Sequence, residues 1–138
     1  MTEDIAPTIR AMSKRVILVG HCSPDSSYLS IAIKAVVPDA TIERAMGDVA
    51  LLAALQKGAD LLLINRVLDG DYRNPDGIGM LTQCKVSHPE IPVMLVSNYS
   101  DAQAKATAAG ALPGFGKSEL RSKRTGEILA SVLGGSKL

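Results

Sequence analysis

The strongest constraint on the fold is a series of short apolar runs separated by longer segments with helical spacing. The runs cover residues 15–19, 59–64, 92–96 and 111–115. Their apolar residues are continuous rather than alternating, which is typical of strands buried on both faces of a parallel sheet. A further run, residues 41–46, alternates between apolar and polar side chains and predicts an edge strand.

Helical patterns fill the intervals after these runs, at residues 23–37, 48–57, 77–86, 100–109 and 118–133. Apolar side chains recur in them at helical spacing, and glycine or proline follows most of them. Regular alternation of strand and helix predicts right-handed crossovers and a parallel sheet. We therefore expect an α/β fold, a flavodoxin-like (βα)5 doubly wound sheet with strand order 2-1-3-4-5.

Length and hydropathy limit the domain organisation. A chain of 138 residues is sufficient for one domain. We expect residues 1–14 to form a mobile N-terminal arm and residues 15–135 to form the domain. No apolar run approaches the roughly 18 residues of a membrane-spanning helix, and the N-terminus has no signal-peptide pattern. A cytoplasmic protein is expected.

Composition excludes several classes of function. With 15 Lys and Arg against 14 Asp and Glu, the net charge of +1 gives no overall attraction to nucleic acid or anionic membrane. An aromatic content of 3% argues against a base-stacking surface. Cys22 and Cys84 make no disulfide framework, and two histidines make a zinc site improbable. We expect no metal and no cofactor.

The candidate site follows from the expected topology, because ligands of such sheets bind at the carboxyl ends of the strands. Gly20 and His21 follow the first run, Asn65 follows the second, Ser97 the third and Lys117 the fourth. We expect these residues to meet in one shallow pocket.

Three segments together resemble the receiver domain of two-component response regulators. Gly110-Ala111-Leu112-Pro113-Gly114-Phe115-Gly116-Lys117 is similar to the segment that leads to the family's lysine. Residues 92–97 resemble its fourth strand, which ends in a switch Ser or Thr, and Asp76-Gly77 resembles the start of its third helix. The resemblance covers residues 14–135. It implies a role in two-component (phosphorelay) signal transduction.

The chain differs from the receiver family at the positions of the family's acidic residues. Receivers hold magnesium with an acidic pair after the first strand and accept phosphate on an aspartate after the third. Here those positions are Gly20, His21 and Asn65. Phosphoryl transfer needs an anionic nucleophile and a metal that neutralises the developing charge, and an amide supplies neither. The sequence predicts a degenerate pseudo-receiver, not an enzyme, with Asn65 at the acceptor position and no magnesium site.

Two further features bear on that prediction. The family's switch aromatic, three residues before the lysine, falls on Gly114, so no ring can move there. The segment from Asn65 to Asp76 is longer than the family's usual link. Whether Asp69 or Asp71 in this segment folds back as a substitute carboxylate is left open by the sequence.

We expect a stand-alone module that acts by protein–protein interaction with other signalling proteins, a kinase or an output protein, and that could form a homodimer. The face that often binds partners in this family carries a group of cations: Lys105, Lys117, Arg121, Lys123 and Arg124. Direct binding of nucleic acid or membrane is not expected.

Two alternatives remain. A flavodoxin-like or cobalamin-type domain would bind a small ligand in the same crevice, although Pro24 removes a backbone donor from the loop that would hold a phosphate. A hydrolase would need Ser97 beside His21, and the sequence supplies no acid to orient that pair.

Overall fold

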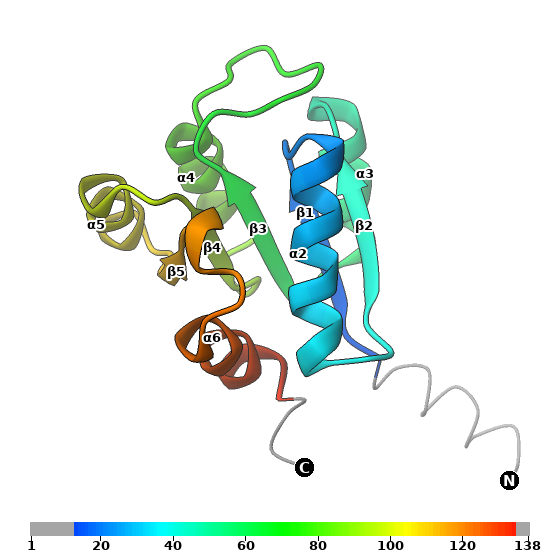
Figure 1. Ribbon diagram of the computed structural model, residues 1–138. Coiled ribbons are helices and arrows are strands. Elements are labelled where there is room, and N and C mark those ends of the chain that lie inside the picture. Colours follow the sequence, from blue (N-terminus) through cyan, green and yellow to red (C-terminus); the bar gives the residue numbers. More distant parts are fainter. Residues whose placement is uncertain (1–12, 135–138) are drawn as a thin grey trace, which may run out of the picture.

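The computed structural model describes residues 13–134, and the expected arm therefore lies outside the described residues except for Ser13 and Lys14. Strands and helices alternate along the chain (Figure 1). The elements are β1 (Arg15–Val19), α2 (Ser23–Val36), β2 (Thr41–Ala45), α3 (Asp48–Lys57), β3 (Leu61–Asn65), α4 (Gly77–Ser87), β4 (Val93–Val96), α5 (Ser100–Ala108), β5 (Leu112–Phe115), the short 3-10 turn η1 (Lys117–Glu119) and α6 (Lys123–Leu133).

All strand pairs are parallel, and the strand order is β2-β1-β3-β4-β5. This is the flavodoxin-like doubly wound sheet predicted from the alternation, with β2 at an edge as its pattern indicated. Side chains of the central strands alternate between two apolar layers. Val16 and Leu18 face α2 and α6, whereas Ile17 and Val19 face α3, α4 and α5. The topology brings the carboxyl ends of β1, β3 and β4 to one edge of the sheet.

The last helix differs from its prediction. The periodic pattern begins at Ser118, but α6 begins at Lys123 with Ser122 as its N-cap, whose hydroxyl accepts a hydrogen bond from the Thr125 amide. The Thr125 hydroxyl donates to the carbonyl oxygen of Glu119 at 2.6 Å. These bonds close the η1 turn before α6 starts, which separates Lys117 from the helix.

No helix in the part of the chain that the structure describes is long and apolar enough to cross a membrane.

Candidate functional site

A hollow of about 220 Å³ lies at the carboxyl edge of the sheet, and Asn65, Ser97 and Lys117 all border it. The structure thus brings together three of the five residues predicted to form the pocket. Gly20 and His21 do not border this hollow. Each of them is covered by another part of the chain.

Gly20 is covered by the β3–α4 loop (residues 66–76). Its φ of +72° lies in the left-handed region that favours glycine. A Cβ atom there would lie 2.7 Å from Cδ2 and 2.9 Å from Cα of Leu68, which is 5% exposed. Leu68 therefore fills the space into which a carboxylate at position 20 would project.

Backbone hydrogen bonds hold the β3–α4 loop in this position. The amide of Asp69 donates to the carbonyl oxygen of Gly20 at 2.9 Å, and the amide of Asp71 donates to that of Met46 at 2.8 Å. The Tyr72 hydroxyl donates to the carbonyl oxygen of Ala45. The loop is therefore tied to the ends of both β1 and β2.

Asn65 uses its side chain to join β3 to the same point. Its Nδ2 atom donates to the carbonyl oxygen of Gly20 at 2.9 Å. That oxygen accepts two hydrogen bonds, one from Asn65 and one from the Asp69 amide. A carboxylate has no proton to donate, so this contact needs the amide at position 65.

His21 is fully buried rather than lying in a polar loop, which the sequence did not indicate. Its Nε2–H donates to the carbonyl oxygen of Leu63 at 2.9 Å, and Nδ1 has no partner among residues 13–134. Burial is the main reason that the pKa of His21 falls from 6.5 to about 4, and the nearby charge of Lys117 contributes to this shift. At neutral pH the ring is uncharged.

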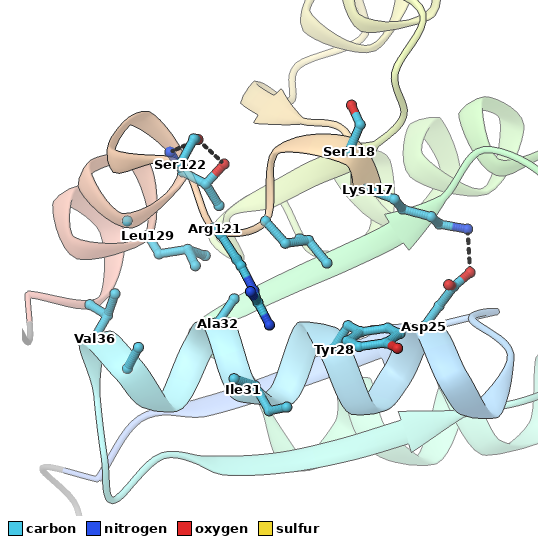
Figure 2. Close-up of a pocket in the computed structure, with 14 residues that line it drawn as sticks. Asp25, Tyr28, Ile31, Ala32, Val36, Lys117, Ser118, Arg121, Ser122 and Leu129 are labelled. Atoms are coloured by element: carbon cyan, nitrogen blue, oxygen red, sulfur yellow. Dashed lines mark hydrogen bonds and ion pairs between the residues drawn. The ribbon is translucent and has the colours of Figure 1, made fainter.

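Lys117 forms an ion pair with Asp25 of α2, with 2.7 Å between Nζ and Oδ2 (Figure 2). The Lys117 ammonium group holds the pKa of Asp25 below its ordinary value of 3.8. Asp25 is not among the residues that the sequence predicted to form the site. Asp25 lies in the first turn of α2, five residues after Gly20, and its place in that turn is the signal that could have found it.

The carboxylates of the long loop lie elsewhere. Asp69 and Asp71 are exposed, and the backbone of Asp71 bridges to Gly47 at the start of α3. Within residues 13–134 no group of three or more His, Cys, Asp or Glu side chains is arranged to hold a metal ion.

Ser97 and Gly114 are both fixed by local hydrogen bonds. The Ser97 hydroxyl accepts from the Tyr99 amide at 3.1 Å, as in a turn. No hydrogen bond joins it to His21 within residues 13–134, so the hydrolase alternative gains no support. Gln103 of α5 donates to the carbonyl oxygen of Leu95 at 2.8 Å and accepts from the Gly114 amide at 3.2 Å.

The predicted cationic face is not one patch. Lys105 borders a hollow beside Tyr99, whereas Lys117 and Arg121 border a groove between α2 and α6. Lys123 pairs with Glu127 at 3.9 Å, and Arg124 binds Glu119 at 3.2 Å. The residues named for a partner interface therefore face at least two different surfaces.

Solved structures similar to this chain are receiver domains of response regulators. They include the signal receiver domain of a DNA-binding response regulator from Colwellia psychrerythraea, with a TM-score of 0.70, 16% identity and coverage of 88% of this chain and 99% of that one. A response regulator from Thermotoga maritima has a TM-score of 0.71, 14% identity and coverage of 89% and 99%. The non-phosphorylated receiver domain of Escherichia coli RcsB has a TM-score of 0.70, 15% identity and coverage of 90% and 96%.

The chain has the receiver fold. Identities this low establish the fold alone, and the function has to be argued from the site. No protein-family model matches the chain, and no curated protein matches it in sequence.

Proposed function

We propose that the protein is a receiver-fold module of two-component signalling that acts through protein contacts and without phosphorylation. The observation that carries the proposal is that side chains of the protein itself fill the space at the carboxyl ends of the strands. Leu68 occupies the space above Gly20, and the Asn65 amide is bonded to the Gly20 carbonyl oxygen.

The chemistry of this edge disfavours phosphoryl transfer. An acceptor must present an anionic oxygen, and a divalent cation must stabilise the charge on the transferring group. Asn65 presents an amide that already donates a hydrogen bond. The Asp25 carboxylate borders the groove between α2 and α6 rather than this hollow, and it is paired with Lys117. Neither requirement is met by these residues.

The arrangement around Gly114 favours a fixed surface rather than a switched one. A switch requires an element with two arrangements of similar free energy. The Gln103 side chain joins α5 to β4 and β5 by hydrogen bonds. A Cβ atom on Gly114 would lie 3.0 Å from the Oε1 atom of Gln103. A partner would accordingly recognise α5 and β5 in one conformation.

Intact-mass measurement after treatment with acetyl phosphate and magnesium tests the proposal. We expect no phosphoryl adduct on the parent, and essentially none on Asn65→Asp, because the substitution restores the acceptor but no metal site. A receiver that carries its acceptor aspartate serves as the positive control. Efficient labelling of the parent would overturn the proposal, as would a partner whose affinity changes after the treatment.

A further inference from the structure

A groove of about 580 Å³ runs between α2 and α6, away from the hollow that Asn65 borders. Figure 2 shows its two sides, with Tyr28, Ile31 and Ala32 on α2 and Leu129 on α6. It extends from Asp25 to Val36, roughly 16 Å along the helix axis. The Asp25–Lys117 ion pair lies at one end. Its volume falls within the range of small-molecule sites, roughly 300–1,000 Å³.

One residue that borders the groove is a glycine whose backbone and neighbours do not require one. Gly126 lies inside α6 and borders the groove, and a Cβ atom there would meet nothing within 4 Å. Glycine in a helix interior costs about 1 kcal/mol relative to alanine. Neither a positive φ nor a close neighbour accounts for Gly126. Because it is a glycine, no side chain at this position projects into the groove.

Among residues 13–134, one of the cations that border the groove has no acidic partner. Asp25 is paired with Lys117, Glu119 with Arg124 and Glu127 with Lys123. Arg121 is exposed, borders the groove and forms no ion pair or hydrogen bond with any residue from 13 to 134. Figure 2 shows its side chain extending toward α2 near Ala32. A guanidinium group binds a carboxylate through two parallel hydrogen bonds.

We propose that this groove binds a small amphipathic anion, with its apolar body between α2 and α6 and its carboxylate on the Arg121 guanidinium. The apolar surface is supplied by Ala32, Val36 and Leu129, and the exposed ring of Tyr28 forms part of the rim. The groove shares Lys117 with the hollow at the carboxyl edge of the sheet, but Arg121, Gly126 and Leu129 do not border that hollow. The proposed binding does not depend on the phosphorylation-independent role.

Three compounds that share one apolar body test the assignment: phenylbutyrate, phenylbutanol and phenylbutylamine. Each is titrated into the isotopically labelled full-length chain while amide chemical shifts are recorded. We expect saturable shifts at Ala32, Ala35 and Gly126. The acid should bind about tenfold more tightly than the alcohol, since a charged hydrogen bond contributes at least that factor. The amine should bind most weakly.

Two variants and one control substitution locate the binding. Arg121→Gln should reduce the affinity for the acid to that for the alcohol, whereas Lys123→Gln, which removes a cation that does not border the groove, should change nothing. Gly126→Leu should abolish binding of both compounds by filling the groove. Its folding is checked by far-UV circular dichroism and by the thermal midpoint, which should not fall because leucine favours a helix.

Equal affinity for acid and alcohol in the parent would overturn the proposal. Binding that survives Gly126→Leu would also overturn it, and so would the absence of saturable shifts up to the solubility limit of the acid. If the groove amides shift with protein concentration alone, a second copy of the chain covers this surface and the assignment to a small ligand is wrong.

Discussion

Leu68 lies over Gly20 so closely that a Cβ atom on the glycine would be 2.7 Å from the leucine Cδ2 atom. A side chain at position 20 and the present course of the β3–α4 loop therefore exclude each other. The contact therefore favours glycine at the position directly after β1.

The first prediction compares two glycines with positive φ. Gly58→Ala, where nothing lies within 4 Å of the new Cβ, should cost only backbone strain, about 1 kcal/mol. Gly20→Ala should lower the free energy of unfolding by about 2–4 kcal/mol, because the clash with Leu68 adds to that strain. Urea denaturation of both variants measures the difference.

Leu68→Ala should relieve part of the Gly20→Ala cost in a double-mutant cycle, giving a coupling of about 1 kcal/mol. The relief is partial because the Leu68 Cα atom also lies within 3.0 Å of the added methyl group. Strictly additive effects would mean that the two residues do not meet.

The second prediction concerns pH and His21, whose pKa burial lowers from 6.5 to about 4. Between these values the unfolded chain binds a proton at this ring and the folded chain does not, so stability rises with pH by about 1.4 kcal/mol per unit. We expect the free energy of unfolding to fall by up to about 3 kcal/mol between pH 7 and pH 4. The pKa of Asp25 lies below 3.8, so its contribution is lost only under more acidic conditions.

His21→Gln should flatten this pH dependence, because the glutamine amide can still donate to Leu63 but does not titrate. His88→Gln, at the other histidine of the chain, is the matched control and should keep the slope of the parent. The measurement is urea unfolding at a series of pH values. An unchanged slope in His21→Gln would contradict the buried, neutral state of this ring.

The third prediction concerns the ion pair of Lys117. Asp25→Asn should leave stability within about 1 kcal/mol of the parent, because both side chains are partly exposed to solvent. It should, however, free the ammonium group and raise the affinity for inorganic phosphate severalfold, as followed by amide shifts of Asn98 and Lys117. Glu127→Gln frees the exposed Lys123 and should leave phosphate binding unchanged. Equal affinity in the parent and Asp25→Asn would show that the ion pair does not limit anion binding.

The fourth prediction tests the two hydrogen bonds by which the Gln103 side chain joins β4 to β5. Gln103→Leu leaves the Leu95 carbonyl oxygen and the Gly114 amide without their partner and should cost about 1–3 kcal/mol. Gln83→Leu, on the exposed side of α4, should cost less than about 0.5 kcal/mol. Faster amide hydrogen exchange at residues 112–116 in Gln103→Leu alone would locate the loss. Comparable losses of stability in the two variants would show that the Gln103 hydrogen bonds do not hold β4 and β5 together.

The fold could be predicted from the sequence because its signals are local and repeated. Continuous apolar runs such as 61–64 can be buried only between two helical layers, and the crossover rule then leaves few topologies. The meeting of Asn65, Ser97 and Lys117 followed from that topology, since each residue lies at or just after the end of a strand.

The contacts that close the site could not be predicted in this way, because they depend on how loops and helices are oriented. Leu68 is one apolar residue in a polar loop, and nothing local indicates that it covers Gly20. Asp25 reaches Lys117 only through the rotation of α2 and the early closure of η1. His21 is fully buried although it follows a glycine and precedes a polar helix start, which is a tertiary effect.

The central claim is that side chains of the protein itself fill the space at the carboxyl ends of β1 and β3. A magnesium titration followed by amide chemical shifts tests this claim most directly. We predict that residues 20–22 and 65–67 do not shift at millimolar magnesium, because Leu68 and the Asn65 amide occupy the space and no group of three or more His, Cys, Asp or Glu side chains among residues 13–134 is arranged to hold a metal ion. Saturable shifts at these residues would contradict the account and would identify Asp69 or Asp71 as a metal ligand.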